Sequence, residues 1–146
     1  MIQLSIIDDK LTIYKNNKVI LFGAGKTGNL VYKRLKVLGI TVYAFCDNAQ
    51  EKWNTNIDGI DVVQPEELFS VMEKSYIVQI ASIYNDEIEM QLKSYGITNY
   101  ISYWEFEQRL YDLSKYRVLK NERWRKFYIH DAHLFDVMKT NNEWPM

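Results

Sequence analysis

The sequence has little of several residue types: one cysteine, two prolines and two histidines among 146 residues. A single cysteine excludes a disulfide framework and a zinc site made of several thiolates. The first residues lack the basic and then apolar pattern of a signal peptide, and no apolar run approaches the roughly 18 residues of a membrane-spanning helix. We therefore expect a cytoplasmic protein with a reduced thiol.

The charge is also small, at -1 at pH 7, so the chain as a whole has no attraction to nucleic acid. Hydrophobic residues make up 47% and charged residues 25% of the sequence, which is typical of a globular protein. A length of 146 residues fits one domain with a continuous core.

Strand-like and helix-like segments alternate along most of the chain. Short apolar or β-branched runs predict strands at 18–22, 41–46, 60–63, 76–81 and 99–103, and helical periodicity predicts helices at 26–38, 65–72 and 84–95. Because the helices make right-handed crossovers between the strands, the sheet is parallel. The sequence predicts a single Rossmann-like α/β domain with about five strands in the order 3-2-1-4-5 and helices on both faces. Its ligand site lies at the carboxyl ends of strands 1 and 4.

Residues 23–28, Gly-Ala-Gly-Lys-Thr-Gly, form a Gly-x-Gly-x-x-Gly motif between a predicted strand and a predicted helix. The first glycine permits a tight turn, the second lets phosphate oxygens reach backbone N–H groups, and the third lets the helix approach the strand. The positive end of the helix then suits a diphosphate. The predicted phosphate site consists of Gly23, Ala24, Gly25, Lys26, Thr27 and Gly28. The alternative is that the glycines only pack the helix against the strand.

An acidic residue is expected about 20 residues after this turn, at the end of the second strand. Asp47 lies there, 19 residues after the last glycine of the motif. A carboxylate at this place accepts hydrogen bonds from both ribose hydroxyls and repels a 2′-phosphate, which favours NAD or another ribonucleotide over NADP. Asn48 follows it, and Ala81 and Ser82 end the fourth strand at the same edge of the sheet. Ser82 either binds a phosphate or sugar hydroxyl or caps the next helix, and Tyr84 is expected to line the cleft.

Gly25-Lys26-Thr27 also resembles the end of a Walker A loop, which needs a glycine five residues before Gly25. Ile20 occupies that position, so a P-loop kinase or NTPase is excluded. Lys26 either lies near a phosphate as a point charge or is an exposed lysine in the first helical turn.

Several segments together resemble one group of bacterial Rossmann domains. They are 19–28 with the glycine motif, Ala44-Phe45-Cys46-Asp47-Asn48 with Lys52-Trp53, Ile57-Asp58-Gly59-Ile60, Pro65-Glu66-Glu67-Leu68, and Ala81-Ser82 before Tyr84. Similar domains occur in membrane-linked nucleotide-sugar dehydratases, in sugar C-methyltransferases and in some sugar acetyltransferases, enzymes of nucleotide-sugar and surface-polysaccharide synthesis. The resemblance covers about residues 18–104 and implies binding of NAD or a nucleotide-sugar, without implying a defined reaction.

The two ends of the chain lie outside the alternating pattern. Apolar residues at helical spacing predict a short capping helix within 2–15 and a long amphipathic helix within 104–146. We expect residues 1–104 to form the Rossmann-like nucleotide-binding domain and residues 105–146 a C-terminal helical extension. The extension packs on its own domain or on a partner, either a second copy in a homodimer or a catalytic protein.

Tyr111 and Lys115, with Ser102 upstream, match the set by which short-chain dehydrogenases deprotonate a substrate hydroxyl. Composition alone predicts about one Tyr-x-x-x-Lys pair by chance. The chain has four: Tyr14/Lys18, Tyr32/Lys36, Tyr111/Lys115 and Tyr116/Lys120. The motif is therefore weak evidence for a dehydrogenase.

Ordinary structural explanations are favoured for the remaining features. His130 and His133 have a spacing that suits a shared metal, but no third ligand is evident, so no metal is predicted. Six basic residues between 115 and 126 suit RNA, although a solvated helix face is the favoured interpretation and nucleic acid is not expected. Cys46 is expected to be a buried strand residue. Trp53 either covers a base or sugar ring or anchors its loop.

Three hypotheses for function follow. The leading one is a module that binds a nucleotide, NAD or a nucleotide-sugar through 23–28, Asp47, Asn48 and Ser82, in nucleotide-sugar or surface-polysaccharide metabolism. The second is an NAD-dependent sugar oxidoreductase or epimerase completed by a dimer or a partner. The third is a non-catalytic interaction or regulatory domain whose glycines are structural. No membrane contact is expected, and whether the protein is an enzyme is left open.

Overall fold

The computed structural model describes residues 10–73 and 75–115, of which 10–15 are helical. The elements that follow are β1 (Lys18–Phe22), α2 (Lys26–Val37), β2 (Val42–Cys46), the 3-10 turn η1 (Gln50–Lys52), β3 (Asn56–Ile57), β4 (Ile60–Val63), α3 (Pro65–Val71), β5 (Tyr76–Ile80), α4 (Asn85–Ser94), β6 (Tyr100–Ile101) and α5 (Tyr103–Lys115). The five predicted strands and the three helices predicted at 26–38, 65–72 and 84–95 are all present, with small differences at their ends. Gly39 and Gly96 follow α2 and α4 with φ of 81° and 78°, as expected for glycines that end helices.

The strands form one sheet in the order β3-β4-β2-β1-β5-β6. β1 lies at its centre and pairs in parallel with β2 and β5, so that Leu21 is opposite Phe45 on one side and Gln79 on the other. The five predicted strands correspond to β4, β2, β1, β5 and β6, and both their order and their parallel direction are confirmed. The chain therefore has the predicted Rossmann-like α/β fold.

The predicted count of about five strands was one short, because β3 adds a two-residue antiparallel partner to β4 at the sheet edge. Two residues are too few to show alternation in sequence. Asp58 and Gly59 connect β3 to β4 with positive φ angles of 55° and 82°. Such angles suit a tight hairpin whose twist matches that of the strands.

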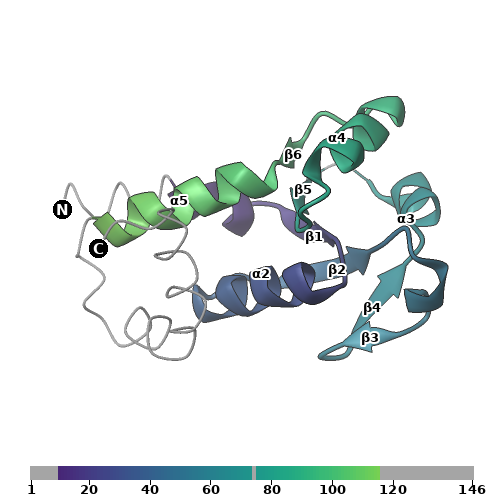
Figure 1. The fold of residues 1–146 in the computed structure, drawn as a ribbon, viewed down its shortest axis with the longest axis horizontal. Coiled ribbons are helices and arrows are strands. Elements are labelled where there is room, and N and C mark those ends of the chain that lie inside the picture. Colours follow the sequence, from purple (N-terminus) through teal and green to yellow (C-terminus); the bar gives the residue numbers. More distant parts are fainter. Residues whose placement is uncertain (1–9, 74, 116–146) are drawn as a thin grey trace.

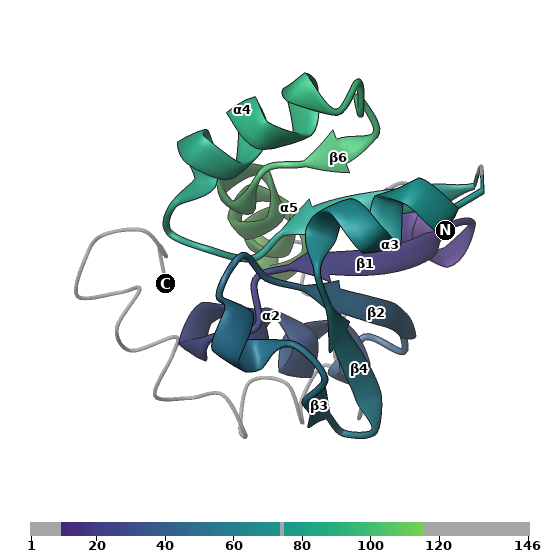
Figure 2. The same ribbon diagram turned by 90° about the vertical axis from the view of Figure 1, so that its right-hand side faces the viewer.

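Helices cover both faces of the sheet, as predicted (Figures 1 and 2). The side chains of β1 alternate between two cores: Leu21 packs with α2, α5 and the 10–15 helix, whereas Ile20 packs with α3 and α4. Both residues are completely buried. This alternation on a strand covered on both sides explains the uninterrupted apolar sequence of β1.

The helix α5 packs on the first core through Phe106, Leu110 and Leu113. The rest of the predicted C-terminal extension, 116–146, and most of the predicted N-terminal helix lie outside the described residues. The division into 1–104 and 105–146 and the partner of the extension stay predictions. No helix among the described residues is both long and apolar enough to span a bilayer.

A buried polar network connects three of these elements. Gln79 on β5 is fully buried, and its amide nitrogen donates to the carbonyls of Ile80, Ile101 and Ser102. The hydroxyl of Tyr14, in the 10–15 helix, donates to Gln79 Oε1 at 2.5 Å. Because each polar atom of the Gln79 side chain has a partner, its burial is compensated, and the network fixes β5 against its neighbours.

Candidate functional site

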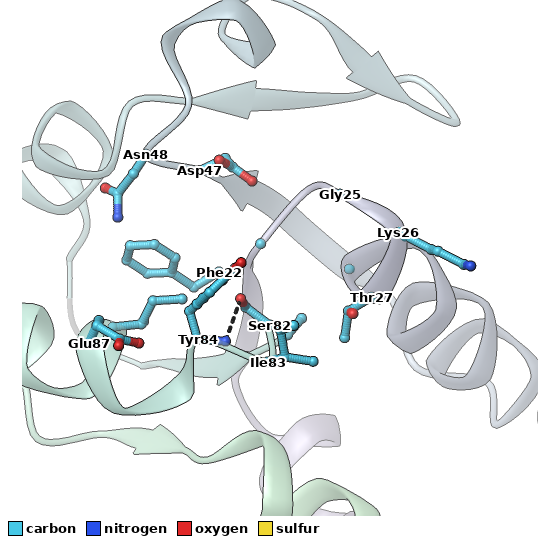
Figure 3. Close-up of a pocket in the computed structure, with 14 residues that line it drawn as sticks. Phe22, Gly25, Lys26, Thr27, Asp47, Asn48, Ser82, Ile83, Tyr84 and Glu87 are labelled. Atoms are coloured by element: carbon cyan, nitrogen blue, oxygen red, sulfur yellow. Dashed lines mark hydrogen bonds between the residues drawn. The ribbon is translucent and has the colours of Figure 1, made fainter. Parts of the chain in front are cut away.

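A cavity of about 580 Å³ opens at the carboxyl ends of β1 and β5, where the strand order reverses (Figure 3). Its lining residues are Phe22, Gly23, Gly25, Lys26, Thr27, Gly28, Asp47, Asn48, Ala81, Ser82, Ile83, Tyr84, Glu87 and Ile88. The volume lies within the range of small-molecule sites. Nine of the ten residues predicted from the sequence line this cavity. The tenth, Ala24, is buried behind the turn.

Two glycines of the turn are required by close contacts inside the protein. Gly23 has a φ of 132°, and a Cβ added to it would lie 2.4 Å from the carbonyl oxygen of Ala81. A Cβ on Gly28 would lie 2.0 Å from the carbonyl oxygen of Gly23. Real side chains do not tolerate either approach. The structural explanation of the motif therefore accounts for Gly23 and Gly28.

Gly25 is different, because no packing contact among the described residues requires a glycine there. Its φ is -91°, open to other residues, and within 10–73 and 75–115 the one atom within 4 Å of an added Cβ is Nζ of Lys52, at 3.8 Å. The missing side chain leaves space that faces the cavity. This space lies over the start of α2, whose first backbone hydrogen bond runs from the N–H of Asn29 to the carbonyl of Gly25.

The amides of the first turn of α2 are available to a ligand. The N–H groups of Lys26, Thr27 and Gly28 precede the first intrahelical bond and so have no partner within the helix. The first turn of α2 contains no acidic residue, whereas α3 and α4 carry Glu66 and Glu67, and Asp86 and Glu87. The positive end of the α2 dipole is therefore not neutralised from within.

Asp47 has a structural role that the sequence did not reveal. Its Oδ2 accepts a 2.8 Å hydrogen bond from the N–H of Ala24, and its Oδ1 accepts one of 2.8 Å from the N–H of Ala49. A carboxylate offers about four lone-pair positions, so both oxygens keep one acceptor position for a ligand hydroxyl. The side chain ties the glycine turn to the loop after β2 while still facing the cavity.

Asn48 joins the two sides of the cavity. Its amide exchanges hydrogen bonds with Gln91 on α4, Nδ2 to Oε1 at 2.8 Å and Nε2 to Oδ1 at 2.9 Å. Gln91 also donates to the hydroxyl of Tyr95 at 2.8 Å. The loop after β2 and the helix after β5 are thereby held at a fixed separation.

The wall formed by the start of α4 was largely missed in the sequence. Only Tyr84 was expected to line the cleft, yet Ile83, Glu87 and Ile88 line it too. Ile83 and Tyr84 are exposed by 62% and 65%, so both present apolar surface at the opening. Helical spacing could have predicted Glu87 and Ile88, because residues three or four positions after Tyr84 share its face of the helix.

Ser82 and Lys26 both lie at the rim. The hydroxyl of Ser82 accepts a 3.0 Å hydrogen bond from the N–H of Tyr84 and so turns the chain into α4, whose first residue is Asn85 (Figure 3). Lys26 is exposed, and its side chain extends away from Asp47 and Asn48 in Figure 3. This geometry agrees with the interpretation of Lys26 as an exposed lysine in the first turn of α2, and not as a point charge near a phosphate.

Two residues next to the cavity are structural. Trp53 donates from Nε1 to the carbonyl of Asp47 at 2.7 Å and anchors its loop, and it is not among the lining residues. Cys46 is completely buried on β2, and burial raises the pKa of its thiol well above the usual value. A neutral, inaccessible thiol is not a nucleophile.

Among the described residues, none of the tyrosines of the Tyr-x-x-x-Lys pairs lines the cavity. Tyr111, on α5, packs against the core, and the hydroxyl of Ser102 accepts a hydrogen bond from the N–H of Glu105. Neither residue lines the cavity. Tyr32 and Lys36 both donate to Oδ2 of Asp58, at 2.7 and 2.9 Å. Burial and the Asp58 hydrogen bond raise the pKa of Tyr32, the opposite of what activation needs.

The remaining sequence candidates cannot be placed. His130, His133 and the basic residues beyond position 115 lie outside the described residues, as do Tyr116 and Lys120. Within 10–73 and 75–115, no group of three His, Cys, Asp or Glu side chains is arranged to hold a metal ion.

A family model described as C2185-like, N-terminal matches residues 15–101, more than half of the chain. The chain belongs to this family. The C2185-like N-terminal match runs from the end of the 10–15 helix to the end of β6, so it includes the whole sheet and every residue that lines the cavity. No curated protein sequence matches the chain.

Two solved structures show partial similarity. UDP-D-quinovosamine 4-dehydrogenase from Vibrio fischeri has 25% sequence identity and a TM-score of 0.46, over 56% of this chain and 74% of that one. RSP, a Rex-family repressor, has 19% identity and a TM-score of 0.49, over 62% of this chain and 46% of that one. The C2185-like chain thus spans less than half the length of the repressor.

Proposed function

We propose that the protein binds a nucleotide with a diphosphate group, NAD or a nucleotide-sugar, in the cavity at the glycine turn. The observation that carries this proposal is Gly25. Gly23 and Gly28 must be glycines because an added Cβ would collide with backbone carbonyl groups of the protein. At Gly25 an added Cβ meets no such group, so the absence of a side chain keeps open the space in front of the α2 amides.

The diphosphate lies over Gly25, on the N–H groups of Lys26, Thr27 and Gly28. Asp47 accepts ribose hydroxyls through its remaining lone pairs and disfavours a 2′-phosphate, so NADP is the weaker ligand. Tyr84 and Ile83 offer apolar surface to a base or sugar ring at the opening. The resemblance of residues 18–104 to domains of nucleotide-sugar enzymes supports a role in surface-polysaccharide metabolism, in the cytoplasm.

Binding is tested first by thermal unfolding with NAD, NADP, UDP-glucose and a CDP-sugar. A ligand at 100 times its Kd stabilises the folded state by about 2.7 kcal/mol. We expect stabilisation by NAD or a nucleotide-sugar. The absence of any stabilisation, checked by isothermal titration calorimetry, would overturn the proposal.

Gly25→Ala then separates binding from folding. Its methyl group meets only the flexible end of Lys52, so the variant is expected to fold as stably as the natural protein while its affinity falls at least tenfold. Gly96→Ala is the matched control, because it adds a methyl group in open space after α4, away from the cavity. It is expected to lose about 1 kcal/mol of stability through its positive φ and to bind normally. Equal binding by Gly25→Ala would contradict the proposed ligand position.

A further inference from the structure

A second positive group lies over the glycine turn, from a different part of the chain. Nζ of Lys52, in η1, is 3.8 Å from the position that a Cβ on Gly25 would occupy. Lys52 therefore holds an ammonium group beside the space that Gly25 leaves open. No local pattern relates it to the turn, since 27 residues separate the two positions.

The loop that carries Lys52 is fixed on both sides. Before Lys52, the N–H of Ala49 donates to Oδ1 of Asp47, and the N–H of Lys52 donates to the carbonyl of Ala49 at 3.0 Å. After Lys52, the Trp53 indole donates to the carbonyl of Asp47 at 2.7 Å. The hydroxyl of Thr55 also donates to the Lys52 carbonyl, at 2.5 Å. The backbone beneath the ammonium group is thus held in place, and Asp47 holds it together with the glycine turn.

The charge of Lys52 is not used inside the described part of the protein. Within 10–73 and 75–115, no carboxylate forms an ion pair with Lys52. Of the carboxylates that line the cavity, Asp47 uses both oxygens for backbone amides and Glu87 belongs to the opposite wall on α4. Nearby, the positive end of α2, whose first turn contains no acidic residue, faces the same space.

We propose that Lys52 is a phosphate-binding residue, whose ammonium group contacts the diphosphate held on the glycine turn. This inference rests on the proposed function. In this proposal the positively charged side chain that contacts the diphosphate comes from the loop after β2. It is not Lys26 of the glycine motif, whose side chain extends away from Asp47 and Asn48 (Figure 3). The anionic part of the ligand is then held from two sides, by the α2 amides and by Lys52.

The test compares Lys52→Gln with Lys33→Gln, which removes the same charge from an exposed position on α2. Neither lysine is among the lining residues of the cavity, but Lys52 lies beside Gly25. Dissociation constants for UDP, ADP and NAD are measured by calorimetry at several salt concentrations. We expect Lys52→Gln to weaken the binding of whichever probes bind by about fivefold, the value of a partly exposed ion pair, and to flatten the salt dependence. Lys33→Gln is expected to leave both the affinity and its salt dependence unchanged, and Lys52→Arg is expected to bind with much of the natural affinity.

An independent measurement uses the natural protein. Acetylation of lysine amines, followed by mass spectrometry, is expected to slow at Lys52 when a probe that binds is added, and to stay constant at Lys33. If the natural protein binds a probe while Lys52→Gln binds it equally well, or Lys52 is not protected, the inference is wrong and the proposed function stands. If no probe binds the natural protein, the proposed function itself fails.

Discussion

The backbone N–H of Ala24 donates a 2.8 Å hydrogen bond to Oδ2 of Asp47, which ties the turn after β1 to the end of β2. Through Oδ1, the same carboxylate holds the loop that continues to Lys52. Asp47 therefore stabilises the shape of the site before any ligand arrives. The side chain predicted to bind ribose thus also connects the glycine turn to the loop after β2.

Replacing Asp47 by Asn is expected to destabilise the protein in the absence of ligand. An amide nitrogen cannot accept a hydrogen bond, so the N–H of either Ala24 or Ala49 loses its acceptor, at a cost of about 1–3 kcal/mol. Urea unfolding without nucleotide measures the loss. Asp61→Asn, at an exposed position on β4, is the control and is expected to change stability by less than about 0.5 kcal/mol. An unchanged stability of Asp47→Asn would show that the two hydrogen bonds contribute little.

Tyr14 is expected to make stability depend on alkaline pH. Burial raises the pKa of its hydroxyl above the usual 10.0, with the charge of Arg109 opposing this in part. The folded state therefore binds the Tyr14 proton more tightly than the unfolded state. This contribution is complete below pH 10.0 and is lost progressively as the pH rises above that value toward the pKa of the folded protein.

Tyr14→Phe removes this pH dependence and a hydrogen bond together. At pH 7 we expect a loss of about 1–3 kcal/mol, because Oε1 of the buried Gln79 loses its donor. Above pH 10.0 the free energy of unfolding should fall less steeply in the variant than in the natural protein. Denaturant titrations from pH 7 to 11 measure both effects, with Tyr43→Phe, an exposed ring on β2, as the control. Equal slopes for Tyr14→Phe and the natural protein would contradict this account.

The reactivity of Cys46, the single cysteine, is expected to measure how often the sheet opens at β2, next to the cavity. Its thiol is fully buried and its pKa is raised, so it should react with a disulfide reagent only after the sheet opens. The folded protein is expected to react far more slowly than the urea-unfolded chain, and more slowly still with a bound nucleotide. The reaction is followed by absorbance, and Cys46→Ser gives the background. Rapid reaction of the folded protein would contradict the burial of β2.

The sequence predicted those parts of the structure that depend on neighbouring residues. Apolar runs predicted the strands, helical periodicity predicted the helices between them, and the glycine motif placed the predicted site at the end of β1. Asp47 was located by its distance from that motif. Its bonds to backbone amides could not be predicted, because an amide N–H carries no sequence signal.

Contacts between distant segments were also missed. Asn48 meets Gln91 across 43 residues, and Lys52 reaches Gly25 only because its loop folds back over the turn. Neither pairing follows from periodicity, which describes one element at a time. β3 was missed for a different reason, its length of two residues.

The cavity has one wall from 22–28 and 47–48 and another from 81–88, which pair only after β5 has docked on β1. During synthesis, a nascent chain that has emerged only as far as β4 carries the complete glycine motif but lacks the second wall. The proposed contacts to a diphosphate and a ribose all come from this first part of the chain, whereas the apolar surface of Ile83 and Tyr84 belongs to the second wall. A chain that ends after β4 would therefore contain the proposed phosphate contacts without the surface proposed to meet a base or sugar ring.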